Sequence, residues 1–127
     1  MRAVDTNVLL RLLVHDDAKQ AAAAEAYVAP GAWVSHLVLA EAMWVLGSVF
    51  NRVPADIATC VTMLLEHESL VVQDADTVRR ALNGFTERPA LGFSDCLILE
   101  IALKAGHGPL GTFDRDLAKL RGAQRLS

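Results

Sequence analysis

Four carboxylic acids stand where an apolar segment of the chain meets a turn or a small residue. They are Asp5 in Ala-Val-Asp-Thr-Asn, Glu41 in Leu-Ala-Glu-Ala, Asp95 in Phe-Ser-Asp-Cys-Leu-Ile and Asp114 in Gly-Thr-Phe-Asp-Arg-Asp. At a separation of ~4 Å and an effective dielectric constant near ~20, two carboxylates repel each other by about 4 kcal/mol. A group of them therefore needs shared protons or a bound cation. Hard oxygen ligands select Mg²⁺ or Mn²⁺, which indicates phosphate chemistry.

The segments around these acids predict short strands that alternate with helices. We expect strands at 3–4, 32–34, 70–72, 109–112 and 123–126, and helices at 7–14, 18–28, 37–50, 54–66, 74–87, 95–105 and 114–120. This alternation predicts an α/β fold with a buried parallel sheet. Ligands of such sheets bind beyond the carboxyl ends of the strands. We therefore expect Asp5 and Asp114 on one rim, with Glu41 and Asp95 reaching it from neighbouring helices.

Two of the predicted helices carry an acid among apolar residues. The segment 37–50 is apolar almost throughout, so we expect a buried helix in which Glu41 needs a partner. Ser35 and Ser94 are predicted to cap the helices that follow them. The helix at 95–105 is expected to turn Leu97, Ile98, Ile101 and Ala102 inward.

The composition is that expected of a single globular domain whose cysteines are reduced. The chain has 127 residues, of which 53% are hydrophobic, and we expect one domain over residues 1–127. A formal net charge of −3 argues against a broad basic face for nucleic acid, although a metal can still recruit a phosphate. Cys60 and Cys96 lie in apolar stretches, as is typical of cytosolic chains. With no visible signal peptide and no apolar run of ~18 residues, we expect a cytoplasmic protein.

The motifs around the four acids resemble those of the PIN domain, the PilT N-terminus ribonuclease family, and most closely its VapC-type toxins. They are Val4-Asp5-Thr6-Asn7-Val8-Leu9-Leu10-Arg11, Leu39-Ala40-Glu41, Phe93-Ser94-Asp95-Cys96-Leu97-Ile98 and Gly111-Thr112-Phe113-Asp114-Arg115-Asp116-Leu117. One such motif is weak, but four in this order along nearly the whole chain are strong. The resemblance implies a three-layer α/β/α sandwich with a central parallel sheet. It also implies an Mg²⁺- or Mn²⁺-dependent endoribonuclease, a cognate antitoxin, a homodimer, and DNA contact only through the antitoxin.

The resemblance assigns catalysis and metal binding to Asp5, Glu41, Asp95 and Asp114, with a metal-activated water attacking the phosphodiester. Glu41 is either a direct ligand or a hydrogen-bond acceptor behind the ligands. Thr6, Asn7 and Thr112 either satisfy local backbone groups or orient an acid, a water or a phosphate. The role of Asp116 stays open, because only some family members carry an acid there. Arg11 and Arg115 flank the motifs and are the arginines best placed to meet RNA.

Two other functions fit parts of the sequence. Aspartyl phosphoryl transfer, as in haloacid-dehalogenase-like phosphatases, requires a second Asp where Asn7 stands. A regulatory module with little catalysis would act in a DNA-bound complex with its antitoxin, because no DNA-reading motif is present in this chain. His15, His36, His67 and His107 lack metal-motif spacing and are interpreted as surface or loop residues. Trp33 and Trp44 are interpreted as core residues.

Overall fold

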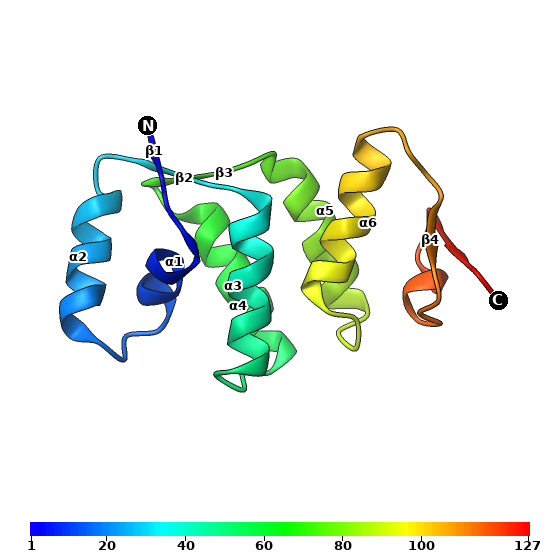
Figure 1. Cartoon of the computed structure of the whole chain (residues 1–127), viewed down its shortest axis with the longest axis horizontal. Coiled ribbons are helices and arrows are strands. Elements are labelled where there is room, and N and C mark those ends of the chain that lie inside the picture. The colour runs from blue at the N-terminus through cyan, green and yellow to red at the C-terminus, as the bar shows by residue number, and fades with distance from the viewer. The chain divides into compact units, whose positions relative to one another are not determined.

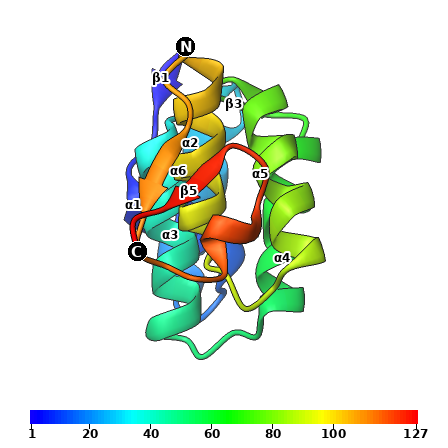
Figure 2. The same ribbon diagram turned by 90° about the vertical axis from the view of Figure 1, so that its right-hand side faces the viewer.

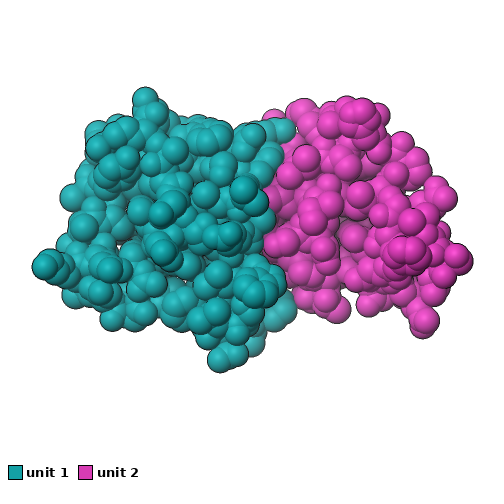
Figure 3. All heavy atoms as spheres, in the orientation of Figure 1, with its two compact units in different colours: residues 1–75 teal, residues 76–127 magenta.

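A computed structural model describes all residues 1–127 of the chain. The chain is divided into two compact units, residues 1–75 and residues 76–127, which Figure 3 colours separately. Each unit has its own parallel strands and its own helices. The single domain expected over residues 1–127 stays a prediction. None of the helices combines the length and the apolar character that a membrane crossing requires.

The first unit is a three-stranded parallel sheet with four helices. Its elements are β1 (Arg2–Ala3), α1 (Thr6–Leu13), α2 (Ala18–Val28), β2 (Ala32–Val34), α3 (His36–Ser48), α4 (Pro54–Glu66) and β3 (Leu70–Val72). The strand order is β1-β2-β3, and a pair of helices connects each strand to the next. In Figure 1 these four helices lie on the same side of the strands. Because parallel neighbours share a direction, the residues that follow β1 and β2 emerge at the same edge of the sheet.

The second unit places two helices before a short parallel strand pair. Its elements are α5 (Ala75–Glu87, which begins at the unit boundary), α6 (Phe93–Lys104), β4 (Leu110–Thr112), the 3₁₀ turn η1 (Leu117–Lys119) and β5 (Ala123–Arg125). β4 pairs in parallel with β5, and both strands contact η1. Figure 2 shows β5 with η1 close beside it. The α/β alternation and the parallel strands that the sequence predicts are therefore present.

Aliphatic side chains form the core of each unit. In β2 and β3 the outer residues are buried and the middle residues, Trp33 and Val71, are exposed, as the two-residue period of a strand requires. In the second unit the rings of Phe85 and Phe93 meet edge to face, with centroids 6.0 Å apart and planes at 80°. Full burial of a leucine or phenylalanine stabilises the fold by ~1.5–3 kcal/mol, so these contacts hold each unit together.

Most predicted element boundaries are confirmed, and the differences have local causes. The strands at 32–34 and 70–72 and the helices at 18–28 and 54–66 have the predicted limits, whereas β1 lies one residue earlier and α3 ends at Ser48. Of the one or two helical turns expected at 114–120, a single 3₁₀ turn, η1, forms. Asp114 Oδ1 accepts hydrogen bonds from the backbone N–H groups of Asp116 and Leu117. These contacts resemble an N-cap and support the first turn, but the chain leaves the helical conformation at Leu120, whose backbone is extended.

The predicted burial of two tryptophans and two isoleucines is wrong. Trp33 is 36% exposed because it alternates with the buried ends of β2, and Trp44 is 65% exposed because α3 buries only the stripe formed by Leu39, Ala42, Met43 and Leu46. In α6, Ile98 and Ile101 are exposed, and the buried residues are Phe93, Cys96, Leu97 and Leu99. Ser94 is not the predicted cap, because the helix begins at Phe93 and its N-cap residue is Gly92.

Candidate functional site

Asp5 lies at the junction between the first strand and the first helix. It is the N-cap residue of α1, and its Oδ1 accepts a hydrogen bond of 3.0 Å from the backbone N–H of Val8. Val4 precedes it and donates its own N–H to the carbonyl of Trp33, which fixes the strand end against β2. A carboxylate has two oxygens with about four lone pairs in total. While Asp5 Oδ1 caps the helix, Oδ2 can still bind a cation. Capping and metal binding are therefore compatible at this residue.

Glu41 lies in the second turn of α3, and its side chain is exposed. The prediction of a buried helix around it is therefore wrong at this position, because Leu37, Glu41 and Trp44 share the exposed face. α3 begins at the end of β2, where Ser35 Oγ accepts a 3.1 Å hydrogen bond from Val38 N–H, as predicted. Because β1 and β2 are adjacent and parallel, Asp5 and the start of α3 belong to one edge of the sheet.

Asp95 and Asp114 interact within the second unit. Asp95 lies in the first turn of α6, as expected, and is partly buried. Burial raises the pKa of its carboxyl, and the negative charge of Asp114 raises that pKa further. These two acids from different elements are therefore close enough for their charges to repel each other.

The backbone around Asp114 is held by a short hydrogen-bond network. Thr112 Oγ1, at the end of β4, accepts a 3.0 Å hydrogen bond from Asp114 N–H. Asp114 Oδ1 then accepts from Asp116 N–H at 2.8 Å and from Leu117 N–H at 3.0 Å. Thr112 thus satisfies a local backbone group, which is one of the two roles that the sequence analysis left open for it. The same contact fixes the acid relative to the end of the strand.

The acids of the second unit have the chemistry that a divalent cation requires. Asp95 and Asp114 are two hard oxygen donors whose mutual repulsion a cation would remove, and Asp114 is already oriented by the backbone. No group of three or more His, Cys, Asp or Glu side chains is arranged to hold a metal ion in the structure. The four predicted acids are divided between the two units, with two in each. A common metal site for all four stays a prediction.

The remaining predicted residues have local partners. The guanidinium of Arg11 forms an ion pair with Asp16, so its contact with RNA would require competition with that carboxylate. Asp116 Oδ1 lies 3.6 Å from Lys119 Nζ, and both side chains are more than half exposed. Arg115 is exposed, and Thr6 is the first residue of α1. These contacts leave the proposed roles of Asp116 and the two arginines untested.

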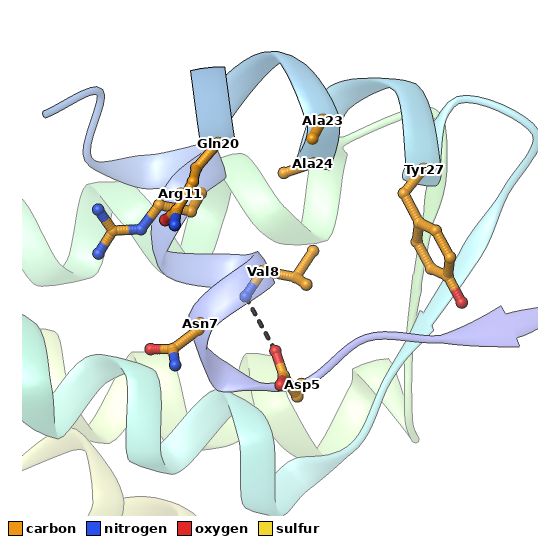
Figure 4. Close-up of a pocket in the computed structure, with 8 residues that line it drawn as sticks. All are labelled: Asp5, Asn7, Val8, Arg11, Gln20, Ala23, Ala24 and Tyr27. Carbon is orange, nitrogen blue, oxygen red and sulfur yellow. Dashed lines mark hydrogen bonds between the residues drawn. The ribbon is translucent and has the colours of Figure 1, made fainter. Parts of the chain in front are cut away.

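A pocket of about 570 Å³ opens beside Asp5 and contains residues that the sequence did not single out. It is lined by Asp5, Asn7, Val8 and Arg11 from the start and body of α1, and by Gln20, Ala23, Ala24 and Tyr27 from α2 (Figure 4). Sequence reasoning singled out neither Gln20 nor Tyr27. The available signal was their seven-residue spacing around two alanines, which places all four side chains on one face of a helix.

The two cysteines and two of the histidines make local structural contacts. Cys60 and Cys96 are both free thiols. Burial, followed by the charges of Asp95 and Glu100, raises the pKa of Cys96 to about 11. The ring Nε2 of His15 lies 3.0 Å from the carbonyl of Leu12, and His67 Nδ1 accepts a hydrogen bond from Ser69 N–H.

Comparison with known proteins yields one family. The model of the PIN domain matches residues 2–123 of this chain. No curated protein matches it. Among solved structures, the chain is similar to the crystal structure of VapC20 from Mycobacterium tuberculosis, described as a toxin that cleaves the sarcin-ricin loop. That similarity covers 93% of each chain at 18% sequence identity and a TM-score of 0.44. A TM-score of this size is too low to support a functional conclusion.

Proposed function

Because the chain belongs to the PIN domain family, we propose that it is a Mg²⁺- or Mn²⁺-dependent endoribonuclease and the toxin of a VapC-type toxin–antitoxin pair. Family membership agrees with the predicted PIN-like α/β/α fold class and supports a nuclease activity. The toxin assignment rests on the four acidic motifs and their order along the chain. The metal requirement, the RNA target and the antitoxin are parts of the proposal.

The observation that carries the proposal is the PIN-domain match over residues 2–123, and the placement of Asp95 and Asp114 supports it. An acid in the first turn of a helix and an acid after a strand are each commonly structural. These two acids, however, lie near enough that the charge of one raises the pKa of the other. Repulsion of this kind destabilises a fold unless a proton or a cation offsets it, and it is common at functional sites.

Each acid has a distinct role in the proposed reaction. Asp95 and Asp114 would hold the divalent cation, and Thr112 Oγ1 keeps Asp114 in place by accepting a hydrogen bond from the Asp114 N–H. Asp5 contributes the oxygen that does not cap α1, and Glu41 is either a further ligand or an acceptor that orients a ligand. When bound, the metal lowers the pKa of a water molecule and stabilises charge on the phosphate.

Purified protein free of antitoxin provides the direct test. It should be incubated with a pool of transfer and ribosomal RNA, with Mg²⁺, with Mn²⁺ and with EDTA, and the ends of the products should be mapped. We expect metal-dependent cuts that leave a 5′-phosphate and a 3′-hydroxyl. The matched control is Asp76→Asn, which removes an exposed acid that pairs with Arg79 on α5 and lies outside the four acidic motifs. Equal cleavage by wild type and Asp95→Asn, or cleavage that persists in EDTA, would contradict the proposal.

A further inference from the structure

The pocket beside Asp5 combines a small apolar floor with a polar rim. Val8, Ala23 and Ala24 leave open space between α1 and α2 because two of the three side chains are single methyl groups. The amides of Asn7 and Gln20 belong to the rim, and each amide offers two donors and an acceptor. A volume of about 570 Å³ lies within the ~300–1,000 Å³ typical of small-ligand pockets. The pocket therefore has the volume and the hydrogen-bonding rim that a small polar ring would use.

An aromatic ring stands at the other side of this pocket from Asn7 and Arg11 (Figure 4). The guanidinium of Arg2 lies 3.9 Å from the centroid of the Tyr27 ring and donates a 3.3 Å hydrogen bond to the Tyr27 carbonyl. A cation over a tyrosine ring stabilises the pair by ~0.5–1 kcal/mol at an exposed site. Arg2 therefore restrains the side chain of Tyr27, which is the aromatic residue that lines the pocket.

The charges around the pocket do not favour a phosphate. Asp5 is a carboxylate, and the positive charge of Arg11 is already paired with Asp16. An anionic group would meet repulsion from Asp5 and little compensating attraction. An uncharged ring with hydrogen-bonding edges would instead use the two amides and the ring of Tyr27. Single-stranded RNA is recognised in this way, by aromatic stacking and by hydrogen bonds to base edges.

From these observations we infer that the pocket between α1 and α2 binds one nucleobase of the RNA substrate, next to the bond that is cut. This inference rests on the proposed ribonuclease function, because Asp5 belongs both to the pocket and to the proposed site. Tyr27 stacks on the base, and Gln20 and Asn7 read its edge. The pocket then determines which nucleotide flanks the cleaved phosphate.

The binding test uses short homopolymeric RNAs of A, C, G or U and an abasic oligonucleotide of equal length, all in EDTA so that nothing is cut. Fluorescence anisotropy with the full-length protein should show tighter binding of at least one base-containing RNA than of the abasic one. Ala23→Leu fills the pocket from its open side and should weaken that binding by ~10-fold or more. Ala22→Leu is the matched control, since Ala22 is exposed on the same helix but does not line the pocket.

A second readout separates failure of the pocket from failure of the proposed function. In cleavage assays with Mg²⁺, Gln20→Ala should change the nucleotide preference beside the cut, whereas Ala22→Leu should keep the wild-type preference. Base-dependent binding by a wild type that cuts no RNA would support the pocket and overturn the ribonuclease assignment. Active protein whose binding and cut-site preference are unchanged by Ala23→Leu and Gln20→Ala would overturn the pocket alone. Weakened binding of a protein partner, with RNA binding unchanged, would instead assign the pocket to a protein segment.

Discussion

Asp95, in the first turn of α6, has a pKa that is raised by burial and also by the charge of Asp114, which lies in the loop after β4. The larger cause of the raised pKa is burial of the Asp95 carboxyl, and the charge of Asp114 adds to it. A partly buried carboxylate that faces a second carboxylate is an unfavourable arrangement in a metal-free protein. This arrangement makes the stability of the protein dependent on pH, on charge and on added cations.

The first prediction concerns stability without metal. Asp95→Asn should raise the free energy of unfolding near neutral pH, because the amide removes both the buried charge and the repulsion from Asp114. The raised pKa means that protonated Asp95 favours the folded state, and this stabilisation is lost as pH rises through the folded-state pKa. The difference between variant and wild type should therefore disappear in acid, below the ordinary pKa of aspartate. Urea denaturation in EDTA at neutral and acidic pH measures both quantities.

Asp116→Asn provides the comparison for this experiment. Asp116 is an exposed acid that pairs with Lys119 three residues later, and such surface pairs stabilise a protein by ~1 kcal/mol at most. Its loss should leave stability near the wild-type value or slightly below it. A stabilisation equal to that of Asp95→Asn would mean that general charge reduction, rather than the interaction with Asp114, explains the effect.

The second prediction concerns added metal. A ligand that binds only the folded state at 100 times its dissociation constant stabilises that state by about 2.7 kcal/mol. Wild-type protein should therefore melt at a higher temperature with saturating Mg²⁺ or Mn²⁺ than with EDTA. Asp95→Asn should lose most of this increase, because a neutral amide replaces one of the two charged carboxylate ligands. A wild-type melting temperature that saturating metal leaves unchanged would contradict a metal site.

The third prediction separates the two roles of Asp5. Asparagine caps a helix about as well as aspartate, whereas replacing a capping residue by alanine costs ~1 kcal/mol. Asp5→Asn should therefore abolish RNA cleavage and keep wild-type stability, because its side-chain oxygen can still accept from Val8 N–H. Asp5→Ala should lose both cleavage and stability. Ser35→Ala, which removes only the cap of α3, should lose stability and still cut RNA.

The sequence predicted elements well where local signals act alone. Pro54 fixed the start of α4, and the runs Ala32–Val34 and Leu70–Val72 gave strands with the predicted limits. The failures came from information that one segment does not contain. Burial of Trp44 depends on which face of α3 meets its neighbours, and an apolar helix does not reveal that face. The structure is needed to show that Tyr27 and Gln20 line a pocket together with Asp5, because their positions depend on how α2 packs against α1.

The fourth prediction concerns the two thiols. Burial raises the pKa of Cys60 and is the largest influence there, opposed by the charge of Arg52 and reinforced by that of Asp56. For Cys96 burial is also the largest cause, and the pKa rises from its ordinary value of 9.0 to about 11. Only thiolates react rapidly with alkylating agents, so both cysteines should react slowly at neutral pH. Cys96, which is 1% exposed, should react more slowly than Cys60.

Replacement of both cysteines tests whether they have any chemical role. The Cys60→Ala, Cys96→Ala double variant should cleave RNA in a metal-dependent manner under reducing and oxidising conditions alike. It should be less stable than wild type by on the order of 1 kcal/mol, because the buried Cys96 side chain leaves a small cavity. A variant that keeps its circular dichroism spectrum but cannot cut RNA would show that a thiol takes part in the reaction.

The last prediction concerns the antitoxin and follows from the negative charge of the proposed site. Arginine binds two carboxylate oxygens through its planar guanidinium, so an inserted arginine can replace a divalent cation between carboxylates such as Asp95 and Asp114. We expect the antitoxin to insert an arginine or a lysine toward the four acids and thereby displace the metal. Changing that residue to alanine should restore nuclease activity in a complex that still forms, because the remaining apolar contacts between antitoxin and toxin persist. Size-exclusion chromatography would check the complex, and cleavage of RNA with Mg²⁺ would measure its activity. A variant complex that stays fully inhibited would show that the antitoxin blocks the path of the RNA or distorts the site instead.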